Sequence, residues 1–117
     1  MIISYGWTAQ YLPPSGTKDT TRRCWKPRTL ASWQRSFDRE PGKPHVAVDK
    51  CLAYGGKQIG TIVLKERPYL EKLADMKEEE LLREGGMCNT IEEFIDRYFG
   101  GNGDQMVTVV RFNFESI

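Results

Sequence analysis

A basic segment, residues 16–28, holds the side chains of this sequence that are best suited to chemistry. It carries five cations and a single acid, Asp19, and the cations are Lys18, Arg22, Arg23, Lys26 and Arg28. Threonine hydroxyls and Trp25 lie among these charges. This concentration of cations and donors suits a phosphate, a carboxylate or a polarised carbonyl. The alternative interpretation is a solvated basic loop without a ligand.

The charges of the chain are unevenly distributed along the sequence. Residues 1–60 contain ten Lys and Arg against four Asp and Glu, whereas residues 61–117 contain seven against twelve. If the fold gathers the cations of the first half on one side, that side attracts an anionic partner despite the net charge of +1. If the fold interleaves the two halves, the asymmetry cancels.

The elements that must position the basic segment are predicted from periodicity and from turn residues. Strands are expected over residues 2–7, 45–51, 59–64 and 106–114. The turn at 54–58 joins the middle two strands as a hairpin, and the second of them could continue through 65–67 as far as Pro68. In the last strand, one face carries Met106, Val110, Phe112 and Phe114.

Three helices are expected, over residues 29–37, 79–84 and 91–99. Asp75 and Thr90 each precede a helix with a glutamate three residues later, which is the pattern of a capping box. Paired glycines follow both of these helices and indicate their ends. Few strands, a local hairpin and no repeated strand-helix alternation predict a single α+β domain, residues 1–117, with a mostly antiparallel sheet curled into a small β-barrel with flanking helices.

Composition and cysteine content limit the class of protein. The chain has 117 residues, enough for one core, and neither a secretion signal nor a run of membrane-spanning length is visible. Three widely spaced cysteines, Cys24, Cys51 and Cys88, argue against a disulfide framework and fit a cytoplasmic protein. A zinc site built from them and His45 lacks the usual close ligand spacing, so we expect no metal and no cofactor.

The order of several motifs resembles the ASCH domains of the PUA-like superfamily. Gly16, Lys18, Thr21 and Arg23 give the spacing G-x-K-x-x-T-x-R. Arg83-Glu84-Gly85, then Thr90 to Phe94, then a final apolar strand containing Arg111-Phe112, follow in the same order, so that the match covers nearly the whole chain. The resemblance implies a small PUA-like β-barrel whose cleft accepts RNA or a nucleoside.

Some small members of that family resemble amidohydrolases that act on acetylated cytidine with a lysine, a threonine and a glutamate. The resemblance places these roles on Lys18, Thr21 and Glu84, with Arg23 as an anion-binding or positioning group. A threonine attacks well only if a base removes its proton, and a lysine can do so only if burial or nearby cations lower its pKa from roughly 10.4. Glu84 could then pass a proton to the leaving amine.

Two features of the segment bear on this triad. Extended backbone would place Lys18 and Thr21 on opposite faces, so the triad predicts a turn or helical geometry at this point. Asp19 stands where relatives tend to have a small hydroxyl or apolar residue, and a carboxylate beside Lys18 would keep that lysine protonated. This second feature favours binding over hydrolysis.

Three functions therefore stay open. The first is a module that binds RNA or a modified nucleotide around Lys18 and Thr21, with phosphate contacts from Arg22, Arg23, Lys26 and Arg28 and base stacking on Trp25 or Tyr54. The second is an amidohydrolase for an acylated nucleoside, with Lys18, Thr21 and Glu84 as catalytic residues. The third is a protein-interaction domain without a ligand. Trp25 has the alternative role of a core or lid residue.

Overall fold

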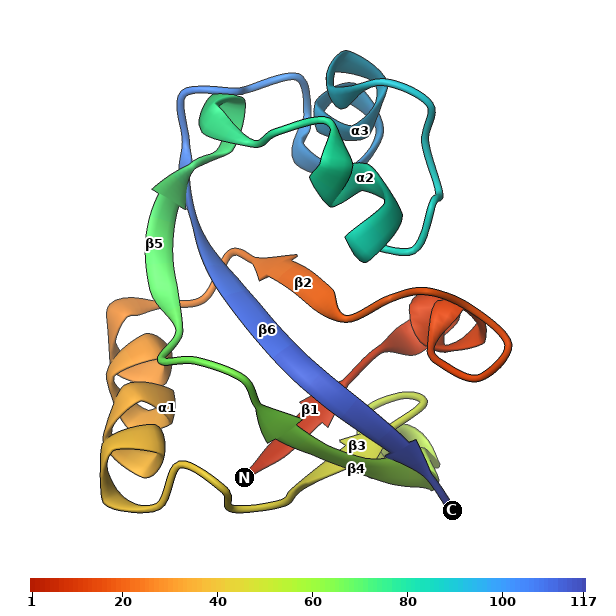
Figure 1. Ribbon diagram of the computed structural model, residues 1–117, viewed down its shortest axis with the longest axis vertical. Helices are drawn as coiled ribbons and strands as arrows, with labels where there is room; N and C mark the ends of the chain where they lie inside the picture. Colours follow the sequence, from red (N-terminus) through yellow and green to blue (C-terminus); the bar gives the residue numbers. More distant parts are fainter.

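The longest strand, β6 (Met106–Ser116), organises the sheet. In the computed structural model, which describes residues 1–117, β6 crosses the molecule diagonally (Figure 1). Its valines and phenylalanines favour extended backbone. One edge of β6 pairs with β4 (Gln58–Leu64) and then with β5 (Tyr69–Lys72), and the other edge pairs with β2 (Thr20–Arg23).

The remaining strands complete a curled half-barrel. The sheet order is β1-β3-β4-β6-β2, where β1 covers Ile2–Ser4 and β3 covers His45–Val48. Four of the five pairings are antiparallel, and only β1 runs parallel to its neighbour β3. The predicted α+β class with a mostly antiparallel, curled sheet is confirmed. Because the half-barrel does not close, β1 and β2 remain as its free edges.

Two hydrophobic clusters fill the molecule, and β6 contributes to both. The barrel cluster consists of Ile3, Tyr5, Leu12, Trp33, Ala47, Ile62, Leu64, Val110 and Phe112. The helix-end cluster consists of Leu73, Met76, Leu81, Cys88, Phe94, Ile95 and Val107. Burial of these side chains is the main source of stability. The barrel cluster and the helix-end cluster meet where the half-barrel contacts the helices Glu79–Arg83 and Ile91–Phe99.

The helices lie at two places around the half-barrel. Helix α1 (Pro27–Arg39) packs beside the barrel through Leu30 and Trp33, while α2 (Glu79–Arg83) and α3 (Ile91–Phe99) lie together at the top of Figure 1, on the side of the molecule where β6 begins. The predicted cap of α3 is confirmed, because the Glu93 amide donates to Thr90 Oγ1 at 3.1 Å. None of the helices combines the length and the apolar character that crossing a bilayer requires.

Several predicted boundaries were wrong. The first strand ends at Ser4 and is followed by the 3₁₀ helix η1 (Gly6–Tyr11), and β3 ends at Val48. Asp75 does not cap α2, because it lies in another 3₁₀ helix, η3 (Leu73–Asp75), and α2 starts after Glu78 without a side-chain cap. Helix α1 extends by two residues at each end of the predicted range.

The sheet also differs from the prediction. Strand β2 forms inside the predicted basic loop, and β5 begins directly after Pro68, whereas residues 65–67 belong to no strand. The predicted apolar face of the last strand is confirmed for Val110, Phe112 and Phe114, which lie in or against the barrel cluster, and is wrong for Met106. Met106 is exposed, while all residues from Val107 to Val110 are buried, since α2, α3 and the barrel interior cover both faces of β6 there.

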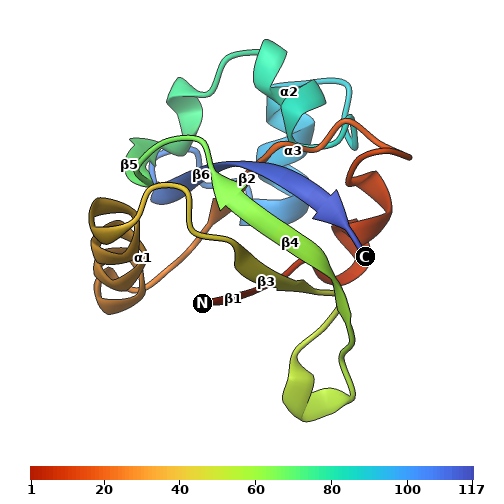
Figure 2. The same ribbon diagram turned by 60° about the horizontal axis from the view of Figure 1, so that its bottom comes forward.

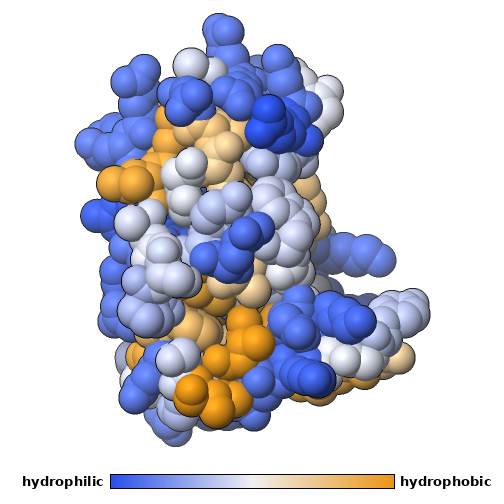
Figure 3. Space-filling view, turned by 90° about the vertical axis from the view of Figure 1, so that its right-hand side faces the viewer, coloured by the Kyte–Doolittle hydropathy of each residue, from blue (hydrophilic) through white to orange (hydrophobic).

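The β3–β4 hairpin reaches farthest from the body of the molecule. Its tip contains the 3₁₀ helix η2 (Leu52–Tyr54) and projects away from the sheet in Figure 2. On the face drawn in Figure 3, hydrophobic residues gather in two main groups, one toward the top and one toward the bottom, with hydrophilic residues between and around them.

Candidate functional site

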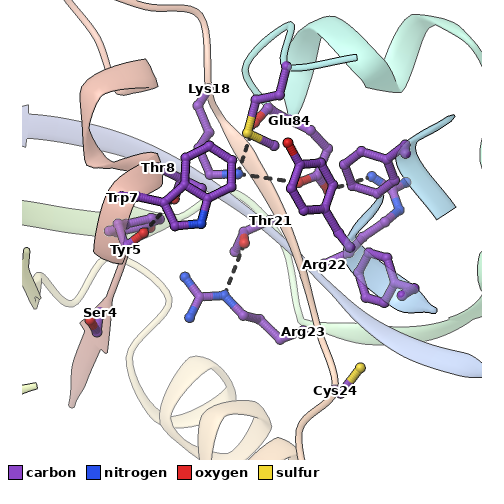
Figure 4. A pocket seen from close by; sticks show the side chains of 14 residues that line it. Ser4, Tyr5, Trp7, Thr8, Lys18, Thr21, Arg22, Arg23, Cys24 and Glu84 are labelled. Atoms are coloured by element: carbon purple, nitrogen blue, oxygen red, sulfur yellow. Dashed lines mark hydrogen bonds and ion pairs between the residues drawn. The ribbon is translucent and has the colours of Figure 1, made fainter. Parts of the chain in front are cut away.

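A cavity of about 260 Å³ lies at the boundary of the two hydrophobic clusters, beside the free edge of β2. Half of its 14 lining residues are hydrophobic. Its polar wall includes Lys18, Thr21, Arg23 and Glu84, and its aromatic wall consists of Tyr5, Trp7, Phe94, Tyr98 and Phe99. Figure 4 shows Lys18, Thr21 and Arg23 following one another along the chain, with Glu84 beside Lys18. An apolar pocket with a few convergent polar groups is typical of a small-molecule site.

Backbone contacts hold the polar wall together. The Thr17 hydroxyl donates to the Leu82 carbonyl at 2.8 Å, and the Asp19 amide donates to the Arg83 carbonyl at 2.9 Å. These bonds tie the segment before β2 to the end of α2. Residues 18 and 84, which are far apart in the sequence, are therefore neighbours in the fold.

Two glycines allow this close approach, and both lie against Tyr11. A Cβ atom on Gly16 would come within 2.1 Å of the Tyr11 carbonyl oxygen, and one on Gly85 within 2.8 Å of Tyr11 Cβ. Gly85 also has a φ of +124°, a conformation that L side chains rarely adopt. The Tyr11 carbonyl in turn accepts the Lys18 amide at 2.9 Å. The glycines thus set the positions of Lys18 and Glu84.

Lys18 is buried, with 2% of its surface exposed, and its ammonium group is fully hydrogen-bonded. Nζ donates to the Thr20 carbonyl at 3.1 Å, to the Glu84 carbonyl at 3.0 Å and to Glu84 Oε1 at 3.2 Å. Burial lowers the pKa of Lys18 from its usual value, more than the neighbouring Glu84 carboxylate raises it. The lysine therefore holds its proton less firmly than an exposed lysine does.

Thr21 and Arg23 project from the same face of β2, as residues two apart on a strand do. Arg23 Nε donates to Thr21 Oγ1 at 3.0 Å, so the hydroxyl proton of Thr21 is free for another acceptor. The predicted turn or helical geometry was wrong, since Thr21 lies in an extended strand. Lys18 precedes that strand, and its long side chain reaches the same cavity without a turn.

Asp19 does not pair with Lys18, contrary to the expectation from their adjacency. Its carboxylate lies 3.0 Å from Lys65 Nζ and 3.6 Å from an Arg83 nitrogen. The Asp19 side chain does not line the cavity. The argument that Asp19 keeps Lys18 protonated, and so favours binding over hydrolysis, therefore fails.

Arg22 is engaged by carboxylates rather than open to a phosphate. Its guanidinium has no exposed surface and lies 2.8 Å from Glu80, 2.9 Å from Glu84 and 3.2 Å from Glu71. Glu80 also binds Arg111 at 2.7 Å, so the charges form one network beneath the cavity. Arg22 binds Oε2 of Glu84, whereas Lys18 binds Oε1, so that both oxygens of the carboxylate are held by cations.

The other predicted binding residues do not converge on the cavity. Trp25 stacks on Trp33 with ring centroids 5.2 Å apart and packs against the barrel cluster, in accordance with its alternative role as a core residue. Lys26 and Arg28 are exposed at the start of α1. Tyr54 is 80% exposed on the tip of the hairpin. None of these four residues lines the cavity.

The aromatic wall was missed by sequence reasoning. Phe94 and Tyr98 lie in the predicted helix over 91–99, and Tyr5 and Trp7 lie in the predicted strand over 2–7, of which the structure keeps only Ile2–Ser4. A place in a helix or a strand gives no sign that these rings also line a cavity. Trp7 is 56% exposed and its ring centroid lies 5.5 Å from that of Tyr98. A tryptophan with that much exposure, in one wall with four other aromatics, is a signal for a ligand surface.

The fold interleaves the two oppositely charged halves of the sequence. Lys18 and Arg22, from the first half, pair with glutamates of the second half, and Asp19 pairs with Lys65. The charge asymmetry therefore cancels inside the molecule.

In comparisons with protein-family models, curated protein sequences and solved structures, no significant match to this chain was found.

Proposed function

We propose that this chain is an amidohydrolase that removes the acyl group from a small acylated nucleoside, such as acetylcytidine. The observation that carries the proposal is the meeting of the Lys18 ammonium, the Thr21 hydroxyl and the Glu84 carboxylate on one partly apolar cavity. The order of motifs in the sequence, which resembles that of ASCH domains, supports the same assignment. Membership of that family is itself part of the proposal.

The proposed reaction starts with attack of Thr21 Oγ1 on the acyl carbonyl carbon. Lys18, once neutral, takes the hydroxyl proton and passes a proton to Glu84 across their 3.2 Å contact. The carbon–nitrogen bond breaks, Glu84 protonates the leaving amine, and the acyl group stays on Thr21. Water, deprotonated by the same groups, then hydrolyses the ester, which releases the carboxylic acid and restores Thr21.

The aromatic wall supports a nucleoside as the leaving group. Trp7 and Tyr98 present ring surfaces on which a nucleobase can stack, and base–aromatic stacking contributes roughly 1–3 kcal/mol. The small cavity favours a single nucleoside over a strand of RNA. Of the cations predicted to contact phosphates, Arg22 is buried among carboxylates.

A second candidate is a binding site for a modified nucleotide without turnover. The saturated hydrogen bonding of the Lys18 ammonium favours it, because a lysine with three engaged protons has no lone pair to act as a base. The two candidates share the cavity and differ in whether Lys18 gives up a proton.

The test is release of cytidine from acetylcytidine by the purified protein. Thr21→Val, which keeps the shape of the side chain, should lower kcat by at least about 10³-fold, as loss of a nucleophile does. Lys18→Met and Glu84→Gln should be similarly inactive, with far- and near-ultraviolet circular dichroism to show that each variant is folded. Thr29→Val and Lys57→Met remove the same groups outside the cavity and should keep full activity.

The outcomes separate the candidates. A folded Thr21→Val protein with wild-type turnover rejects the proposed nucleophile. A wild-type protein that binds acetylcytidine but releases no cytidine supports the second candidate. Binding to short RNA that weakens steeply with salt would instead indicate phosphate contacts.

A further inference from the structure

The Tyr5 hydroxyl is buried at the cavity without a hydrogen-bond partner. Tyr5 directly follows β1, is 3% exposed, and packs in the barrel cluster with its ring centroid 5.4 Å from that of Phe112. Its ring borders the cavity, but its oxygen bonds to no group of the protein. An unpaired buried hydroxyl costs stability, so such a group in a cavity wall points to a ligand that completes it.

Arg23 lies over the ring of Tyr5 and is also incompletely paired. Its guanidinium carbon is 5.3 Å from the centroid of the Tyr5 ring. The guanidinium uses Nε for Thr21, while its terminal nitrogens pair with no carboxylate. Lys18 and Arg22, the other cations of the cavity, are both bound to Glu84. The Arg23 guanidinium and the Tyr5 hydroxyl therefore both have donors without an acceptor oxygen in the protein.

We propose that Tyr5 Oη and the terminal nitrogens of Arg23 form the subsite that binds the acyl oxygen of the substrate. The inference rests on the proposed amidohydrolase function. Because Arg23 Nε holds Thr21 Oγ1 and the guanidinium lies over the Tyr5 ring, an acyl carbonyl attacked by Thr21 can place its oxygen on the side of the guanidinium and of Tyr5. Both groups donate to the carbonyl oxygen and, more strongly, to the oxyanion that forms when Thr21 attacks.

Two properties of Tyr5 suit it to this role. Burial raises the pKa of its phenol, so that the hydroxyl stays a hydrogen-bond donor throughout the working pH range. The ring is fixed on one side by Phe112 and faces the Arg23 guanidinium, so the donor is already in place before the substrate binds. A fixed donor needs no reorganisation during the reaction.

The test variant is Tyr5→Phe, which removes one oxygen and keeps the ring against Phe112 and Arg23. We expect kcat for acetylcytidine to fall roughly 10²- to 10³-fold, with KM changed only a few-fold, because the bond strengthens in the transition state. The urea midpoint should stay the same or rise, since the hydroxyl has no partner in the protein to lose. Tyr54→Phe, at the exposed tip of the β3–β4 hairpin and outside the cavity, should change neither quantity.

Wild-type kcat in Tyr5→Phe would overturn the subsite while leaving the amidohydrolase standing. A lower urea midpoint would also overturn it, because it would show that the hydroxyl has a structural partner. If the wild type releases no cytidine, the proposed function fails, and calorimetric titration decides the subsite by itself. The subsite is supported if the wild type binds acetylcytidine more tightly than cytidine and Tyr5→Phe does not. It is rejected if Tyr5→Phe keeps this preference, or if the wild type binds neither nucleoside.

Discussion

The Lys18 ammonium lies 3.2 Å from Glu84 Oε1, although 66 positions separate the two residues in the sequence. Both side chains are almost completely buried. The pair joins the segment that enters β2 to the end of α2, and it forms one wall of the cavity. The candidate site and the link between the half-barrel and its helices therefore use the same two side chains.

The first prediction concerns the charge network behind this pair. Arg22→Met should lower the free energy of unfolding by about 3–5 kcal/mol, because three glutamates would lose their shared, buried cation. Urea denaturation measures the change. Arg67→Met, which breaks the exposed pair with Asp38, should cost about 1 kcal/mol or less. Equal losses in the two variants would contradict the dominant role of the buried network.

The second prediction concerns the pH dependence of hydrolysis. Lys18 acts as a base only when neutral, so kcat/KM should rise with pH and level off above the Lys18 pKa, which burial holds below the usual 10.5. A pH–rate profile for acetylcytidine measures this. Asp19→Asn should leave the midpoint of the rise unchanged, because Asp19 pairs with Lys65. A midpoint displaced in that variant would show that Asp19 does act on Lys18.

The third prediction concerns the close contact of Gly16 with Tyr11. Gly16→Ala should cost roughly 1–3 kcal/mol of stability, because the added methyl group would collide with the Tyr11 carbonyl and force the backbone apart. Turnover should fall as well, since that carbonyl fixes the Lys18 amide. Gly42→Ala, where no atom lies within 4 Å, should change stability by less than about 0.5 kcal/mol. Thermal unfolding and cytidine release are the two measurements.

The fourth prediction concerns His45 and stability in acid. Burial, with smaller effects of the Met1 amine and Lys43, lowers the pKa of His45 from 6.5 to about 4. Between these values the unfolded chain binds a proton that the folded protein excludes, so stability is complete above pH 6.5 and falls as the pH drops toward 4. The loss should be on the order of 2 kcal/mol.

Urea denaturation of the wild type and of His45→Gln, at pH 7 and pH 4.5, tests the role of His45. Carboxylates also titrate in acid, so the relevant quantity is the difference between the two proteins. The variant should lose less stability than the wild type over this range. Identical losses would assign the acid sensitivity to other groups.

Local patterns predicted the elements whose signals are contained in a few neighbouring residues. Thr90 with Glu93 defines the start of α3, and the left-handed Gly100 defines its end. The alternating valines and phenylalanines of β6 made it the clearest strand. In each case the residues that determine the structure are adjacent in the sequence.

The missed elements depend on partners that are distant in the sequence. The residues of β2 are threonines and arginines, which look like a solvated loop until β6 pairs with them and Glu80 and Glu84, in and directly after α2, bind Arg22. Tyr54 and Trp25 looked equally suitable for stacking with a base, but Tyr54 lies on an exposed hairpin and Trp25 packs against the barrel cluster. Which aromatic reaches the cavity is decided by the curl of the sheet, and no short pattern encodes it.

The place of β6 in the sheet has a consequence for synthesis of the chain. This strand follows every other strand in the sequence, yet β2, β4 and β5 all pair with it and both hydrophobic clusters contain its side chains. On the ribosome, the earlier strands must therefore emerge without their common partner. The half-barrel can assemble only once residues 106–116 have left the exit tunnel.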